Sequence, residues 1–163
     1  MSNPIIKYEH KRLPLWLKTK LPGTHKFFQL KSLLKKYGLN TVCESASCPN
    51  IGACWDAGNL TIMILGDTCT RACRFCDVPT GHLNLPDPEE PYKVALSLSR
   101  LDLKFAVITS VDRDDLPDGG AGHWVKTIKA IRDLCPKIKI ETLIPDFQGD
   151  TGLIRKVCDA YPD

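Results

Sequence analysis

The chain has 163 residues, of which 43% are hydrophobic and 25% charged, with a net charge of +3. This composition predicts one soluble globular domain with its own hydrophobic core. The longest apolar run is too short to cross a bilayer and the first residues carry no secretory signal, which argues against membrane and exported proteins. We therefore expect a cytoplasmic protein, whose eight cysteines act as thiols rather than as disulfides.

The charge is distributed unevenly along the chain. Residues 1–42 contain nine Lys or Arg residues and one acidic residue, whereas residues 43–163 contain thirteen basic and eighteen acidic residues. A basic segment ahead of an acidic body indicates an anionic partner, although a charged helix in water explains the same pattern equally well.

The first third of the chain is predicted to be an extended arm, a helix and a loop. Residues 1–24 contain three prolines and no hydrophobic period, which indicates the arm. A helix follows because apolar residues recur at three- and four-residue steps, and Thr24 can cap its start while Gly38 can end it. A loop over residues 43–55, broken by Pro49 and Gly52, carries the first three cysteines: Cys43, Cys48 and Cys54.

From residue 60 onward the sequence alternates between strand and helix patterns. Strands are predicted at residues 60–65, 105–111 and 137–144. Each is followed by an amphipathic helix, with Pro91 in the first turn of the first helix and Asp150 or Thr151 capping the last. This order predicts parallel strands joined by right-handed crossovers.

Three more cysteines lie within one stretch of eight residues after the first predicted strand: Cys69, Cys73 and Cys76. Thiolates are the ligands of iron–sulfur clusters and of structural zinc. A structural zinc site is normally closed by a fourth protein ligand, whereas three ligands leave a position open for a substrate or cofactor. Chemistry in parallel α/β folds collects at the carboxyl ends of strands, which places this loop and the polar segment 109–115 on one rim.

These motifs resemble a known family. The spacing Cys-x3-Cys-x-Phe-Cys resembles the radical S-adenosylmethionine enzymes. The upstream spacing Cys43-x4-Cys48-x5-Cys54, the segment Leu-Pro-Leu-Trp-Leu-Lys at 13–18 and the segment at 109–123 are similar to the lipoyl synthases within that superfamily. The resemblance runs from about residue 13 to the end. It implies an α/β fold of the radical S-adenosylmethionine type, a partial TIM-like barrel with about three β/α units in residues 58–163 after a helical and loop extension in residues 1–57.

The resemblance also implies cofactors. Cys69, Cys73 and Cys76 would hold a [4Fe–4S] cluster that binds S-adenosylmethionine and donates the electron that generates a 5′-deoxyadenosyl radical. A second, auxiliary [4Fe–4S] cluster on the upstream cysteines would donate sulfur. Phe75 matches the aromatic position beside the adenine, and further candidate contacts with S-adenosylmethionine are Thr109, Ser110, Gly119 and Gly120. No catalytic side chain is assigned.

The implied activity is insertion of two sulfur atoms into an octanoyl chain on a lysine of a carrier protein. A reductant such as ferredoxin or flavodoxin would supply electrons. Such carriers tend to be acidic, so the basic segment from Lys7 to Lys36 is predicted to dock one, and neither a membrane nor a nucleic acid is expected as partner. The family barrel has about six β/α units and a distant serine ligand for the auxiliary cluster. The sequence is therefore predicted to be the N-terminal half, inactive alone.

Two other interpretations stay open. One is another sulfur-inserting radical enzyme, similar to biotin synthase, which the upstream triad argues against. The other is a zinc-binding interaction module whose basic arm contacts nucleic acid. Cys135 and Cys158 are predicted to be small core residues on the apolar sides of helices, and His123 a surface residue or one beside the site.

Overall fold

The structure is a computed structural model, and it describes residues 14, 17–19, 21–101, 103 and 105–163. The helices are α1 (His25–Tyr37), α2 (Val42–Ser45), α3 (Ile51–Asp56), α4 (Glu90–Leu101), α5 (Ala121–Leu134) and α6 (Thr151–Cys158), with a 3-10 turn η2 (Phe147–Gly149) before α6. The strands are β1 (Asn40–Thr41), β2 (Thr61–Ile64), β3 (Phe105–Ser110) and β4 (Lys139–Leu143). Among the helices of the described residues, none is both long and apolar enough to span a membrane.

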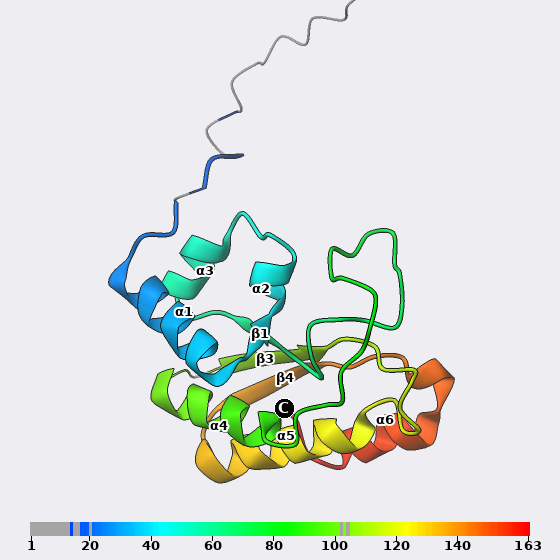
Figure 1. Cartoon of the computed structure of the whole chain (residues 1–163). Coiled ribbons are helices and arrows are strands. Elements are labelled where there is room, and N and C mark those ends of the chain that lie inside the picture. Colours follow the sequence, from blue (N-terminus) through cyan, green and yellow to red (C-terminus); the bar gives the residue numbers. More distant parts are fainter. Residues whose placement is uncertain (1–13, 15–16, 20, 102, 104) are drawn as a thin grey trace, which may run out of the picture.

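The strands form one open sheet in the order β1-β2-β3-β4. β2, β3 and β4 are parallel, with Ile62 opposite Ile108 and Ala106 opposite Ile140. β1 adds a short antiparallel edge to β2. Helices α4, α5 and α6 lie along one face of this sheet (Figure 1). The predicted fold is confirmed: consecutive parallel strands joined through helices form part of a β/α barrel.

The core lies between the sheet and these helices. Ile62, Ile108 and Ile140 project from the strands and are completely buried, as is Trp124 of α5. Full burial of such side chains contributes about 1.5–3 kcal/mol each. The same hydrophobic cluster extends to α1 and α3 through Leu30 and other residues, so the N-terminal helices share a core with the sheet.

Helix α1 begins and ends as the sequence predicts. The Thr24 hydroxyl accepts the Phe27 N–H at 3.2 Å, and Gly38 closes the helix in the left-handed conformation with φ of 62°. The predicted extended arm lies largely outside the described residues, as do those of its lysines that fall within residues 1–13 and at position 20.

Two sequence predictions are wrong in this region and at the end of the chain. The predicted loop over residues 43–55 contains the short helices α2 and α3, which have too few turns to show a hydrophobic period. Cys158 is exposed rather than buried, because α6 turns Val157 toward the core instead. Cys135 follows the last residue of α5 and is half-buried, with its sulfur 3.7 Å from the Ala95 carbonyl oxygen.

Candidate functional site

The carboxyl ends of β2, β3 and β4 lie at one edge of the sheet, and the long segment 65–89 that joins β2 to α4 leaves from this edge (Figure 1). This segment carries the downstream cysteines. Cys69 is nearly buried and its N–H donates to the Pro79 carbonyl at 2.9 Å, whereas Cys73 and Cys76 are exposed. One of the three thiols is therefore anchored in the protein, and the other two face solvent within a short turn.

The sulfur of Cys69 has a polar environment. It accepts the backbone N–H groups of Arg71 at 3.4 Å and Asp112 at 3.3 Å. Amide donors stabilise an electron-rich sulfur, which suits a ligand of an iron–sulfur cluster. All eight cysteines are free thiols. The donor set therefore fits such a cluster, although the described residues hold no group of three His, Cys, Asp or Glu side chains already gathered for a metal ion.

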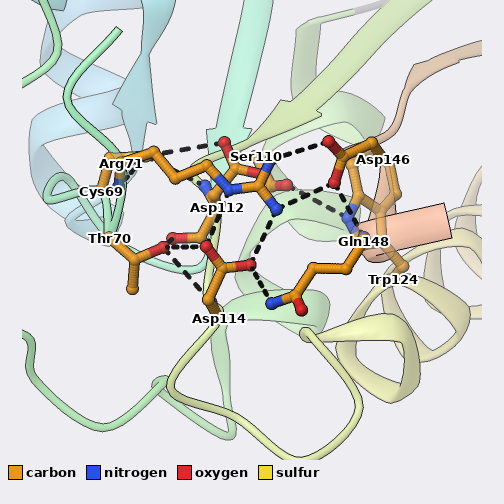
Figure 2. Close-up of polar contacts among 9 residues, drawn as sticks. All are labelled: Cys69, Thr70, Arg71, Ser110, Asp112, Asp114, Trp124, Asp146 and Gln148. Carbon is orange, nitrogen blue, oxygen red and sulfur yellow. Dashed lines mark hydrogen bonds and ion pairs between the residues drawn. The ribbon is translucent and has the colours of Figure 1, made fainter. Parts of the chain in front are cut away.

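Arg71, between the first two of these cysteines, joins three loops (Figure 2). Its Nε and Nη2 donate to the two oxygens of Asp114 at 2.7 and 2.8 Å, and its Nη1 and Nη2 donate to those of Asp146 at 2.8 Å each. Asp114 follows β3 and Asp146 follows β4. Bidentate pairs of this kind are the stronger type of ion pair and fix geometry as well.

The ion pairs shift the ionisation of their members. Hydrogen bonds from Arg71 lower the pKa of Asp146 to about 2 and hold the pKa of Asp114 well below its ordinary value. The same hydrogen bonds to Asp114 and Asp146 raise the pKa of Arg71. All three groups are charged at neutral pH.

Two neutral side chains complete this contact. The Thr70 hydroxyl lies 3.0 Å from the Asp112 carbonyl oxygen and 3.1 Å from an oxygen of Asp114. Gln148, in η2, donates its amide to Asp114 at 3.0 Å (Figure 2). We refer to Thr70, Arg71, Asp114, Asp146 and Gln148 as the Arg71 network. It fastens the segment 65–89, which we call the cysteine loop, to the loops after β3 and β4.

The residues predicted to contact S-adenosylmethionine lie at the same edge. They differ in exposure and in the hydrogen bonds that they already make within the protein. Thr109 donates its hydroxyl to the Leu143 carbonyl at 3.0 Å, and the Ser110 hydroxyl accepts the indole N–H of Trp124 at 3.2 Å. Both hydroxyls therefore already make protein contacts. Phe75 is 94% exposed in the cysteine loop.

The glycine pair at 119 and 120 has positive φ values of 55° and 87°. A Cβ at Gly120 would lie 2.5 Å from Cδ1 of Leu65. Gly120 is thus required by backbone conformation and by packing against Leu65, whatever its role toward a ligand.

The upstream triad lies on the N-terminal helices. Cys43 is in α2, Cys54 is in α3 and Cys48 lies between them, and all three are half-buried. Trp55, completely buried beside Cys54, stacks on Phe27 of α1 with ring centroids 5.0 Å apart. The Thr24 hydroxyl also bonds to Asp56, so α3 is attached to the start of α1.

Several residues at this edge were missed by sequence reasoning. Sequence reasoning does not single out Arg71, Asp146 and Gln148, nor the buried charges of Arg113 and Glu90, which bond to backbone groups of another segment. The only sequence signal for Arg71 is its position between two candidate metal ligands. Its partners cannot be read from the local sequence, because they are 43 and 75 residues away. His123 is half-buried and contacts Glu90 at 2.6 Å, which places it beneath the site rather than on the surface.

Comparison with known families agrees with this arrangement. Residues 2–48 match the N-terminal domain of lipoyl synthase, and residues 63–163 match the radical S-adenosylmethionine superfamily. The two matches cover the upstream and downstream cysteine triads in large part, and the second one covers more than half of the chain.

Curated relatives give the same result. A lipoyl synthase of Methanocella arvoryzae is 54% identical over 151 residues, which are 92% of this chain and 51% of the relative. A lipoyl synthase of Parabacteroides distasonis is 51% identical over 95% of this chain and 55% of its own length. One of Thermus thermophilus is 51% identical over 92% and 47%. The chain spans about half the length of these relatives. It belongs to the radical S-adenosylmethionine superfamily and, within it, to the lipoyl synthase family.

Proposed function

We propose that this chain is part of an enzyme that inserts two sulfur atoms into the octanoyl chain of an octanoyl-lysyl carrier protein. The observation that supports this most is the form of the downstream loop at the carboxyl edge of the parallel sheet. Cys69 is anchored there by backbone amides, and Cys73 and Cys76 stay exposed within the same eight residues. Three thiols with an open side suit a cluster that also binds a cofactor.

We assign Cys69, Cys73 and Cys76 as ligands of one [4Fe–4S] cluster, with S-adenosylmethionine beside it. When bound, this pair supplies the radical chemistry. The protein supplies placement: the amides at the Cys69 sulfur fix one ligand, and Arg71 holds the loop against two neighbouring loops. Exposed Phe75, on the same loop, is free to stack on an adenine.

We assign Cys43, Cys48 and Cys54 to a second, auxiliary cluster that serves as the sulfur source. Their positions support this, because Cys43 on α2, Cys54 on α3 and Cys48 in the turn between the two helices are all half-buried and span twelve residues of the chain. The residue range 1–57 then carries the auxiliary site, and the range 58–163 the site for the radical reaction.

The positive charge on α1 supports an acidic carrier protein as the partner. Lys26, Lys31, Lys35 and Lys36 are exposed on α1, and their positive charge would attract an acidic carrier domain. Association through exposed charges weakens with salt, because screening acts beyond about 10 Å at 0.1 M ionic strength. Neutralising these lysines should lower carrier affinity and flatten its salt dependence. A ferredoxin or flavodoxin would supply electrons, and we place the reaction in the cytoplasm.

Anaerobic reconstitution with iron and sulfide tests the assignment. A brown protein with equal iron and acid-labile sulfide is expected, and Cys73→Ala and Cys48→Ala should each remove the signal of one cluster. Cys158→Ala is the matched control and should keep both. Added S-adenosylmethionine should change the electron paramagnetic resonance spectrum of the reduced downstream cluster alone. A colourless chain that binds only zinc would support the interaction-module alternative instead.

A further inference from the structure

The residue that joins β2 to the cysteine loop has an unusual backbone. Leu65 has a φ of 70°, in the left-handed region that residues with a side chain rarely adopt, and Gly66 follows with a φ of 103°. Such a conformation persists where the surroundings impose it. The direction in which the chain enters the cysteine loop therefore depends on what holds Leu65.

Both backbone polar groups of Leu65 are bonded to buried charged side chains. Its N–H donates to Oε2 of Glu90 at 2.8 Å, and its carbonyl accepts from Nη1 of Arg113 at 3.1 Å. Glu90 is 6% exposed and Arg113 is 3% exposed. Charged side chains are seldom buried this deeply unless all their bonding groups are used.

Each of these charges is fixed by further contacts. Oε2 of Glu90 also lies 2.6 Å from Nε2 of His123, and Arg113 makes a bidentate pair with Asp115 at 2.8 Å for each bond. Nη2 of Arg113 also donates to the carbonyl of Asn84 at 3.0 Å. Leu65 begins the segment 65–89 and Asn84 lies near its end, so one buried guanidinium holds the two ends of the cysteine loop together.

We propose that Arg113 and Glu90 are positioning residues that close the base of the cysteine loop and so keep Cys69, Cys73 and Cys76 ready to bind metal. The inference rests on the proposed function of these thiols. Neither residue touches the candidate ligands, and both act through Leu65. Arg113 acts also through Asn84.

Arg132 offers a matched control at the opposite side of the same domain. It is partly buried, and like Arg113 it donates to two backbone carbonyls, those of Ile138 at 2.8 Å and Tyr161 at 3.0 Å, and pairs with an aspartate, Asp163. Arg132→Lys thus removes the same kind of contact without involving the cysteine loop.

The first measurement is hydrogen exchange of the metal-free chain. Arg113→Lys keeps the charge but cannot reach two carbonyls and a carboxylate together. It should raise exchange in residues 66–86 by about 10- to 100-fold, the loss expected for one charge-assisted hydrogen bond. Arg132→Lys should leave that segment unchanged. Equal exchange of the segment in the two variants would overturn the proposal.

The second measurement is iron retention. In a background that carries Cys43→Ser, Cys48→Ser and Cys54→Ser, iron reports on the downstream loop alone. Its release to a chelator should be faster in Arg113→Lys than in Arg132→Lys. Glu90→Gln keeps an acceptor for the Leu65 N–H and should retain iron better than Glu90→Ala. Release at the same rate in all four variants would contradict the proposal.

If the unsubstituted chain assembles no cluster, the proposed function fails while the exchange comparison still decides whether Arg113 and Glu90 hold the loop. If Arg113→Lys does not fold, the pair Glu90→Gln and Glu90→Ala carries the same comparison.

Discussion

The two cysteine triads are held in place by different forces. The upstream thiols lie on α2, on α3 and in the turn between them, and α3 is attached to α1 by the buried stack of Trp55 on Phe27. The downstream thiols lie in a segment without helix or strand, which charge-assisted hydrogen bonds of Arg71 and Arg113 fasten to neighbouring loops. One triad therefore depends on the volume of the core, and the other on ion pairs.

This difference separates the perturbations to which each triad should respond. Apolar packing is insensitive to pH and salt but cannot tolerate a cavity. Ion pairs at a loop tolerate changes in the core but fail when one partner is lost or neutralised. Substitutions in one region should thus leave the other triad nearly unchanged, and each prediction below tests that independence.

The largest effect is expected from Trp55→Ala. Trp55 is completely buried, and a truncation of this size in a core costs about 3–5 kcal/mol in the free energy of unfolding. Chemical denaturation of the metal-free chain measures this loss. Iron bound by the upstream triad should fall further than iron bound downstream.

Trp55→Phe is the matched control. It keeps most of the stack on Phe27 and removes the Nε1 group, which has no hydrogen-bond partner among the described residues. Its cost should be clearly smaller than that of Trp55→Ala, because the cavity that it leaves is much smaller. A loss as large as that of Trp55→Ala would mean that packing volume is not what holds α3.

The next effect is expected from Arg71→Ala. The variant leaves the carboxylates of Asp114 and Asp146 without their shared cation and should destabilise the closed loop locally. Loss of the Asp114 pair should cost at most about 1 kcal/mol, because solvent screens it. Hydrogen exchange in residues 70–76 should rise accordingly, while the midpoint of global unfolding hardly moves. Arg71→Lys should recover only part, because an ammonium cannot bond both carboxylates bidentately. A large fall in global stability would show that the network belongs to the core.

Sequence patterns predict the strands and the longer helices better than they predict what holds the two triads in place. Strands, crossover helices and the caps at Thr24 and Gly38 follow from local periods and local chemistry, and the structure confirms them. Helices α2 and α3 are too short to show a hydrophobic period, so the sequence predicts a loop for the upstream triad. The carboxylates that pair with Arg71 and the carbonyls that accept from Arg113 come from distant segments that only the folded sheet brings together, and no local pattern indicates them.

A smaller effect is expected from acid. The pKa of Asp146 is about 2 and that of Asp114 is also lowered, against an ordinary value of 3.8, while the pKa of Arg71 is raised. Carboxylates with lowered pKa stabilise the folded state above the ordinary value, and this contribution is lost as the pH falls through the lowered one. The Arg71 network should therefore stay intact from neutral pH down to about pH 4 and open at lower pH.

Nuclear magnetic resonance titration of the Asp carboxyl carbons in the metal-free chain measures these values. In Arg71→Gln both should return toward 3.8, because the hydrogen bonds from Arg71 are the largest cause of each shift. Asp118, whose pKa is lowered by the backbone N–H groups of Gly120 and Gly122 against the opposing effect of burial, serves as the internal control and should not respond. An unchanged Asp114 in Arg71→Gln would remove the electrostatic basis of the comparison.

The smallest effects are expected at the two cysteines outside both triads. Cys158 is exposed, so Cys158→Ser should change stability by less than about 0.5 kcal/mol and leave iron content unaltered.

Cys135 is half-buried, and burial raises the pKa of its thiol, so less of it is present as the thiolate that binds metal and reacts with alkylating agents. In the metal-free chain, iodoacetamide should therefore modify Cys158, Cys73 and Cys76 before Cys135. Reconstitution with iron should then protect Cys73 and Cys76 while Cys158 stays reactive. Protection of Cys158 by iron would mean that metal binds through thiols outside the two triads, and the division into two separately held sites would be wrong.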